Sequence, residues 1–168
     1  GYHFTSDYQQ RLETGLDRLI RASKYAEEKG VQLLLENMNR EPEDAEVNYL
    51  GHTLDECRFL FDNLTSPNIN WSFTINHATL VPEGIDGFLD AFGIARIGEV
   101  RVADNLGDKE HHMYPGEGSI DFRGFFKRME DLGYSGHFTN GFGTLEDMLT
   151  GRDYLVGEAK AAGVKAAQ

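Results

Sequence analysis

The stretch that decides the fold is Gly30-Val31-Gln32-Leu33-Leu34-Leu35-Glu36-Asn37. A short apolar run between a glycine and a polar pair is typical of a buried parallel strand. Before it, residues 7–29 place Leu12, Leu16 and Leu19 at helical spacing among charged residues, and the pattern stops at Gly30. This spacing predicts an amphipathic helix that leads into the strand. Glu36 is therefore expected at the carboxyl end of a strand.

The alternation of helix and strand continues to the end of the chain. Further strands are expected over residues 69–75, 99–103 and 136–139. Further helices are expected over residues 53–64, 85–92, 121–132 and 144–162, several of them after capping residues. Residues 37–52 are polar, include Pro42 and are predicted to form a long loop. Alternation of this kind implies an α/β fold with parallel strands and helical crossovers.

Polar residues cluster where the predicted strands end. They are Glu36, residues 74–77, residues 101–105 and Asn140. In parallel α/β folds, the carboxyl ends of the strands form the functional face. We therefore expect these residues to form one ring around a site.

The composition excludes several classes of protein. The 168 residues are enough for one domain with a real core, and 16 Lys and Arg against 28 Asp and Glu give a net charge of −12. Because no basic excess is available to neutralise phosphates, nucleic acid and anionic membranes are disfavoured as partners. No apolar stretch approaches the ~20 residues of a membrane span.

The cysteine count and the N-terminus bear on the compartment. Cys57 is the only cysteine, so no intrachain disulfide can form. It lies on the apolar face of a predicted helix and is expected to be an inert core thiol. The first residues show no signal-peptide pattern, and a cytoplasmic protein is expected. The chain begins with Gly1 rather than Met, which suggests that it was trimmed or cut from a longer frame.

Several segments together resemble the xylose-isomerase-like TIM barrels, a family of sugar isomerases and epimerases with endonuclease IV as a relative. They are residues 30–37, Thr74-Ile75-Asn76-His77-Ala78, residues 99–105 and Pro115-Gly116-Glu117-Gly118-Ser119-Ile120-Asp121-Phe122, followed by Tyr134-Ser135-Gly136. In order and spacing they are similar to strands five to eight of that family. The resemblance implies that residues 1–168 form a single domain, namely (βα) units five to eight preceded by one helix.

A full (β/α)₈ barrel takes ~250 residues, so the resemblance implies half of a TIM barrel with four parallel strands. Because open sheet edges invite pairing, two copies could close an eight-stranded barrel, and a homodimer or larger assembly is expected. An open α/β sandwich, or the C-terminal piece of a longer protein, is the alternative.

The resemblance also implies a ring of Glu, Asp, His and Glu that holds a divalent metal in the family. In this chain the four positions are occupied by Glu36, Thr74, Arg101 and either Asn140 or Gly141. Hard cations need several anionic oxygen donors, and an arginine cannot act as a ligand. A divalent metal is therefore disfavoured. If one binds, Glu36 and His77 are the expected ligands.

Three functions follow from these observations. The first is a sugar or sugar-phosphate isomerase or epimerase with a degraded metal site. In it Glu36 is the base, and His77, Arg101, Asp104 and Asn140 contact a small carbohydrate. The second is a non-catalytic carbohydrate-binding or scaffold protein, in which Glu36 and Arg101 form a structural ion pair. The third, an endonuclease IV-like phosphodiesterase, is disfavoured by the charge.

Two further motifs have ordinary explanations. His111 and His112 are adjacent, and neighbouring residues on a loop rarely face one ion together, so a solvated loop is expected. Residues 115–118 are expected to form a turn rather than a phosphate cradle.

Overall fold

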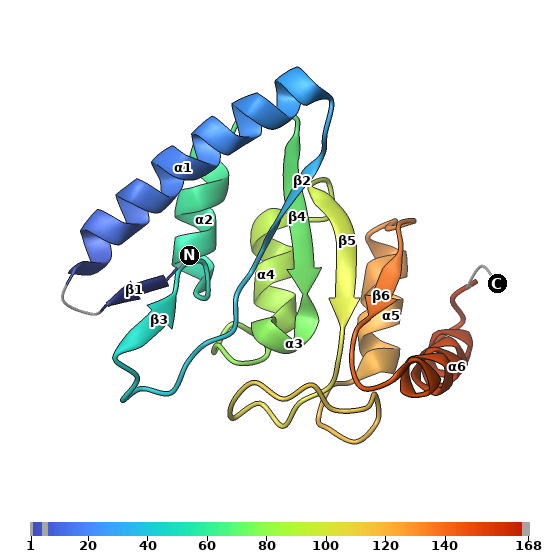
Figure 1. Cartoon of the computed structure of the whole chain (residues 1–168). Helices are drawn as coiled ribbons and strands as arrows, with labels where there is room; N and C mark the ends of the chain where they lie inside the picture. The colour runs from blue at the N-terminus through green and yellow to red at the C-terminus, as the bar shows by residue number, and fades with distance from the viewer. Residues whose placement is uncertain (1, 5–6, 166–168) are drawn as a thin grey trace.

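A four-stranded parallel sheet organises the chain, in agreement with the predicted α/β class (Figure 1). The structure is a computed structural model that describes residues 2–4 and 7–165. The strand order is β2-β4-β5-β6, and each neighbouring pair is parallel. The strands are β2 (Leu33–Glu36), β4 (Ile69–Thr74), β5 (Ile97–Val102) and β6 (Phe138–Asn140).

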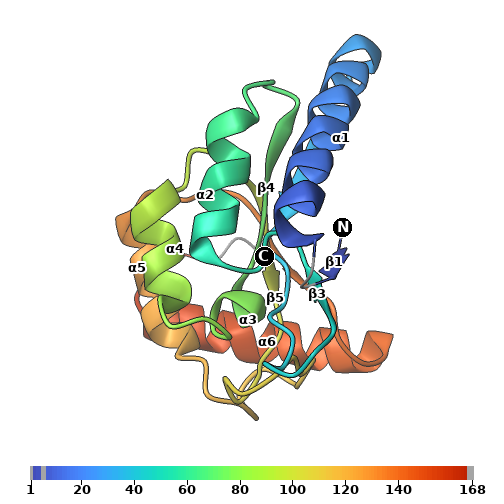
Figure 2. The ribbon, with the colours of Figure 1, turned by 90° about the vertical axis from the view of Figure 1, so that its left-hand side faces the viewer.

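Helices precede, connect and follow the strands of the sheet. They are α1 (Tyr8–Lys29), α2 (Leu54–Asn63), α3 (Ile75–Ala78), α4 (Gly84–Phe92), α5 (Phe122–Asp131) and α6 (Leu145–Ala161). Figure 2 shows α2, α4 and α5 on the same side of the sheet, with α1 along the β2 edge. No helix in the described ranges is long and apolar enough to cross a membrane.

The main core lies between the sheet and this helical layer. Trp71 and Phe73 of β4 are fully buried and pack against Phe88 of α4. Cys57 is buried in the same cluster, as its position on the apolar face of α2 predicts. A second cluster joins Leu12 of α1 to Leu60 of α2. Burial of these apolar side chains is the dominant favourable term that holds the layers together.

The predicted helix ends are confirmed. Thr53 and Asp121 each accept a backbone N–H from the residue three positions later, and Thr144 forms a complete capping box with Asp147. Gly30 ends α1 with a φ of +63°, a conformation that glycine adopts without strain.

Residues 37–52 differ from the expected loop. Within them β3 (Val47–Tyr49) pairs antiparallel with β1 (Tyr2–Phe4). The partner strand lies more than forty residues earlier in the sequence, so no local pattern could reveal the pairing. Residues 75–78 likewise form the short helix α3 rather than the end of a strand, and this turn places His77 at the edge of the sheet.

The face of the sheet opposite the helical layer is polar. Because strand side chains alternate between faces, the burial of Trp71 and Phe73 leaves Ser72 and Thr74 on the other side. Ser72 donates a hydrogen bond to Glu99 of the neighbouring strand. This polar face leads directly to the carboxyl ends of the strands, where the candidate site lies.

Candidate functional site

A cavity of about 260 Å³ opens at the carboxyl ends of β2, β4 and β5. Three of the four positions of the implied metal ring line it, namely Glu36, Thr74 and Arg101, and Gly141 borders it at the fourth. His77 also lines it, from α3. The structure therefore brings together most of the residues that the strand-end pattern selects.

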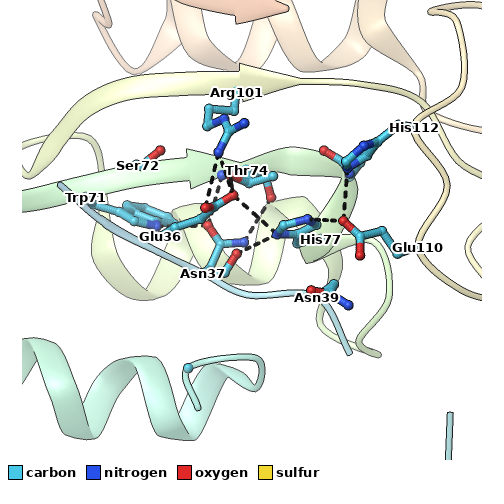
Figure 3. A network of polar contacts seen from close by, with 12 residues as sticks. Glu36, Asn37, Asn39, Trp71, Ser72, Thr74, His77, Arg101, Glu110 and His112 are labelled. Atoms are coloured by element: carbon cyan, nitrogen blue, oxygen red, sulfur yellow. Dashed lines mark hydrogen bonds and ion pairs between the residues drawn. The ribbon is translucent and has the colours of Figure 1, made fainter. Parts of the chain in front are cut away.

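Glu36 is the centre of the polar contacts in the cavity (Figure 3). Thr74 Oγ1 donates to its Oε1 at 2.6 Å, and Arg101 Nη1 lies 3.2 Å from both carboxylate oxygens. His77 Nδ1 lies 3.6 Å from Oε1. The Glu36 side chain is 24% exposed and that of Arg101 is 43% exposed, so a ligand in the cavity can reach both.

Asn37 holds this arrangement in place from beneath. It is 1% exposed. Its Oδ1 accepts hydrogen bonds from Trp71 Nε1 and from the Thr74 backbone N–H, while its Nδ2 donates to the Thr74 carbonyl. Every polar atom of the amide is thus engaged between β2 and β4. Its place beside Glu36 was the only sequence signal for this role.

His77 is oriented by two acceptors. Its Nδ1 lies 2.8 Å from the carbonyl oxygen of Asn37, which can only accept, so Nδ1 carries a proton. Its Nε2 lies 2.9 Å from Glu110 Oε1. The ring is buried and cannot turn without losing both contacts. His77 therefore connects Asn37, the neighbour of Glu36, to the loop that follows β5.

The loop contributes two cavity residues that the sequence did not single out for the site. Glu110 and His112 both line the cavity, and His112 Nε2 lies 2.9 Å from Glu110 Oε1. His111 instead contacts Asp108 at 3.0 Å. The two histidines thus point to different partners, as expected for adjacent residues on a loop, and the His112 side chain is 55% exposed. The sequence signal that could have identified Glu110 and His112 is their Glu-x-His spacing, because residues two apart in an extended segment lie on the same side.

His77, Glu110 and His112 together form a set that could hold a metal ion. One ligand atom from each lies within 4.8 Å of the others. Two imidazoles and a carboxylate suit a cation such as Zn²⁺. The bond from His77 Nδ1 to the Asn37 carbonyl is the outer contact that metal-bound histidines usually make.

The ring implied by the family resemblance does not fit a metal in this chain. Arg101 places a fixed positive charge against both oxygens of Glu36, where a cation would need them free. The hydroxyl group of Thr74 donates its hydrogen bond to the same carboxylate. At the fourth position, Asn140 Nδ2 donates to the Met148 carbonyl and Gly141 has no side chain. One carboxylate and one guanidinium therefore replace the expected set of anionic ligands.

Asp104 lies outside the cavity lining and organises the loop instead. It is fully buried. Its Oδ1 accepts the backbone N–H groups of Asn105 and Ile120, and its Oδ2 accepts those of Gly116 and Gly118. Residues 115–118 are therefore a turn wrapped on a carboxylate, consistent with the expected turn. Asn140 is near the cavity only through its neighbour Gly141.

The chain resembles known proteins along most of its length. A family model described as a xylose isomerase-like TIM barrel matches residues 1–155. An L-ribulose 3-epimerase of Methylomonas sp. is 29% identical over 119 residues, which cover 71% of this chain and 38% of that protein. An uncharacterised protein of Methanocaldococcus jannaschii is 27% identical over 146 residues, or 86% of this chain and 48% of that protein.

Solved structures share the fold. A D-tagatose 3-epimerase-like protein superposes with a TM-score of 0.80 at 23% identity, covering 95% of this chain and 58% of that chain. An L-ribulose 3-epimerase gives 0.72 at 18% identity, covering 91% and 55%. The chain thus spans about half the length of the proteins it resembles.

Proposed function

The chain belongs to the xylose isomerase-like TIM barrel family, and from that premise we propose that it acts on a small carbohydrate as an isomerase or epimerase. The residue that we assign as the base is Glu36. The relatives named as sugar epimerases support the substrate class. The observation that carries the proposal is the contact of Glu36 with Arg101 and Thr74 in an open cavity at the strand ends.

The chemistry requires a base and a stabiliser for the charge that develops. Moving a proton between adjacent carbons of a sugar produces an enediolate-like anion. Glu36 removes the proton from one carbon and returns it to the neighbouring carbon, and the guanidinium of Arg101, 3.2 Å from Glu36, stabilises the anion in between in place of a metal. His77 and Thr74 line the cavity beside Glu36, and we assign them to contacts with the bound sugar. No step requires a cation in the family's ring, where the residues do not fit one.

The protein that performs the reaction is proposed to be larger than one copy of this chain. β2 and β6 form the two ends of the parallel sheet, and within the described residues neither has a partner on its outer side. We propose that residues 1–168 form one unit equivalent to (βα) units five to eight. A second copy completes the barrel as a homodimer. We also propose that the protein acts in the cytoplasm.

The test is a panel of ketose and aldose interconversions with the purified protein. Wild type is expected to convert at least one sugar, and Glu36→Gln, which keeps the shape but removes the base, is expected to lower turnover by ~100-fold or more. Glu99→Gln is the matched control, because Glu99 is a carboxylate on the same sheet that contacts Ser72 outside the cavity lining. Unchanged turnover in Glu36→Gln would remove Glu36 from the role of base.

A non-catalytic carbohydrate-binding protein is the second candidate. The observation that favours it is Arg101 itself, because a guanidinium paired with Glu36 neutralises the group that would act as the base. Binding of sugars from the same panel without interconversion, measured by calorimetry, would support this alternative. A phosphodiesterase resembling endonuclease IV remains disfavoured, because a net charge of −12 repels DNA.

A further inference from the structure

A second buried carboxylate, Glu56, lies outside the cavity on the first turn of α2 and is 4% exposed. Capping-box spacing would direct it back to the N–H of Thr53. Instead, its Oε2 accepts the backbone N–H groups of Gly51 at 2.7 Å and His52 at 3.0 Å. The side chain thus fastens the end of the preceding segment to the helix.

That segment, residues 37–52, forms one wall of the cavity, and we call it the wall segment. Met38, Asn39 and Tyr49 of the wall segment all line the cavity. On its other side a second cavity of about 480 Å³ lies between residues 40–43 of the segment and the start of α1 and α2. The segment is held by the pairing of β3 with β1, by Leu50, which packs against the cluster of Leu12 and Leu60, and by a polar corner at Gly51 and His52.

The polar anchors converge on the corner that Glu56 holds. The carbonyl of Gly51 accepts the backbone N–H of Met38 at 2.8 Å, which joins the two ends of the wall segment. His52 Nδ1 lies 2.7 Å from the carbonyl of Tyr49 and 3.2 Å from Glu56 Oε2. Met38 and Tyr49 at the cavity are therefore connected to the carboxylate of Glu56 through Gly51 and His52.

The corner is an electrostatic pair in partly buried surroundings. Burial acts to lower the pKa of His52, but the hydrogen bond and charge of Glu56 outweigh it, so that pKa is raised. Burial acts to raise the pKa of Glu56, but the contacts from His52 and Gly51 outweigh it, so that pKa is lowered. The other charged or titratable groups facing the pair are Tyr8 of α1, Asp55 and Cys57 of α2, and Arg40 of the wall segment.

The sign of the pH dependence follows from these directions. The contribution of His52 is complete below its unfolded pKa of about 6.5 and is lost as the pH rises through the raised value. The contribution of Glu56 is complete above its unfolded pKa and is lost as the pH falls through the lowered value. The pair is therefore strongest in mildly acidic solution, between about pH 4.5 and 6.5.

We propose that Glu56 is a positioning residue that, with His52, holds the wall segment against the carbohydrate cavity and loosens it as the pH rises above neutrality. The link to a carbohydrate rests on the proposed function, whereas the positioning of the wall does not. The wall becomes a pH-sensitive boundary of the site, although neither Glu56 nor His52 lines the cavity.

Amide hydrogen exchange followed by NMR tests the proposal without any sugar. In Glu56→Gln, which keeps the volume but removes the charge, the amides of Met38, Gly51 and His52 are expected to exchange at least ~10-fold faster than in wild type. Amides of β4 should stay unchanged. Asp55→Asn is the matched control, because Asp55 is an exposed acid on the same turn.

Amide protection of the wild-type protein, measured as a function of pH, is a second readout. A residue with a purely structural role would not make this protection depend on pH. After correction for the intrinsic rate, protection of the same three amides is expected to decline as the pH rises above about 6.5, and His52→Gln is expected to abolish the decline. Wild-type protection in Glu56→Gln, or a change shared equally by β4, would overturn the proposal. So would a flat pH series in wild type. None of these results depends on whether the isomerase assignment is correct.

Discussion

Arg101 is the single residue that most changes what the site can do. The family resemblance implies a histidine ligand at its position, and the structure instead places a guanidinium 3.2 Å from both oxygens of Glu36. A neutral ligand can be released or protonated, whereas a guanidinium stays charged at every accessible pH. The strand-end ring of Glu36, Thr74 and Arg101 is therefore suited to stabilising a negative charge rather than to holding a cation.

Replacing Arg101 separates function from folding. Because the pair is 43% and 24% exposed, Arg101→Gln is expected to cost less than about 1 kcal/mol of unfolding free energy. The same change should lower turnover, or sugar affinity if the protein only binds, by ~100-fold, because the stabilising charge is lost. Urea denaturation and the sugar panel measure the two effects. Arg123→Gln breaks the surface pair with Glu158 and is the control. A large loss of stability in Arg101→Gln would indicate a structural ion pair.

A second prediction concerns His77, Glu110 and His112. After treatment with EDTA, the protein is expected to bind Zn²⁺, since these side chains offer three ligands and leave a position for water. His112→Gln is expected to lower the affinity by at least ~10-fold. His111→Gln should not, because His111 contacts Asp108. Calorimetry with Zn²⁺ measures both variants, and equal affinities would argue against the set.

At the scale of elements, the loop between β5 and α5 owes its form to one carboxylate. Asp104 collects four backbone N–H groups from residues up to sixteen positions away. Hydrogen bonds to a charged acceptor are stronger than neutral ones, so this contact fixes the path of the loop. The loop in turn delivers Glu110 and His112 to the cavity.

Glycine variants test how tightly the loop is packed. A Cβ on Gly118 would collide with Asp104 Oδ1 and with the Asn105 carbonyl oxygen. Gly118→Ala is therefore expected to lower the unfolding free energy by about 1–3 kcal/mol. Gly157→Ala, in α6 where a Cβ meets nothing within 4 Å, is expected to raise it by about 0.5–1 kcal/mol. Thermal or urea denaturation of both variants gives the comparison, and a neutral Gly118→Ala would show that the loop is loose.

The sequence predicts the elements well and the site in part. Apolar runs and caps are local, so the strands at 33–36 and 69–74 and the helix that begins after Thr144 agree with expectation within a few residues. The pairing of β1 with β3 was missed because it joins distant segments. Glu110 was missed for a similar reason, since only the course of the loop brings it to His77. Position at a strand end identified Glu36 and Arg101 as cavity residues. It could not show that the Asp104 side chain points away from the cavity and binds backbone N–H groups of the loop.

At the scale of the whole molecule, the exposed edges of the sheet bear on association between copies of the chain. Leu145 and Leu149 of α6 are 70% and 47% exposed near the β6 edge, and Val31 is 50% exposed next to β2. Exposed apolar residues beside open strands favour association. The net charge of −12 on each copy opposes it.

Sedimentation at micromolar protein concentration tests this balance. We expect a dimer that strengthens with added salt, because screening weakens the repulsion between two acidic copies. Leu149→Glu is expected to shift the protein toward monomer, while Leu106→Glu, on the loop at the strand ends, serves as the control for an exposed leucine. A stable wild-type monomer in both low and high salt would contradict the dimer.

The contact between Trp71 and Asn37 has a practical consequence. The chain has one tryptophan, it is fully buried, and its indole N–H donates to the amide that also fixes Thr74, next to Glu36. All indole fluorescence therefore comes from a chromophore two hydrogen bonds from the cavity. A sugar that displaces Thr74 or His77 should change its emission, so binding can be followed optically in the unlabelled protein.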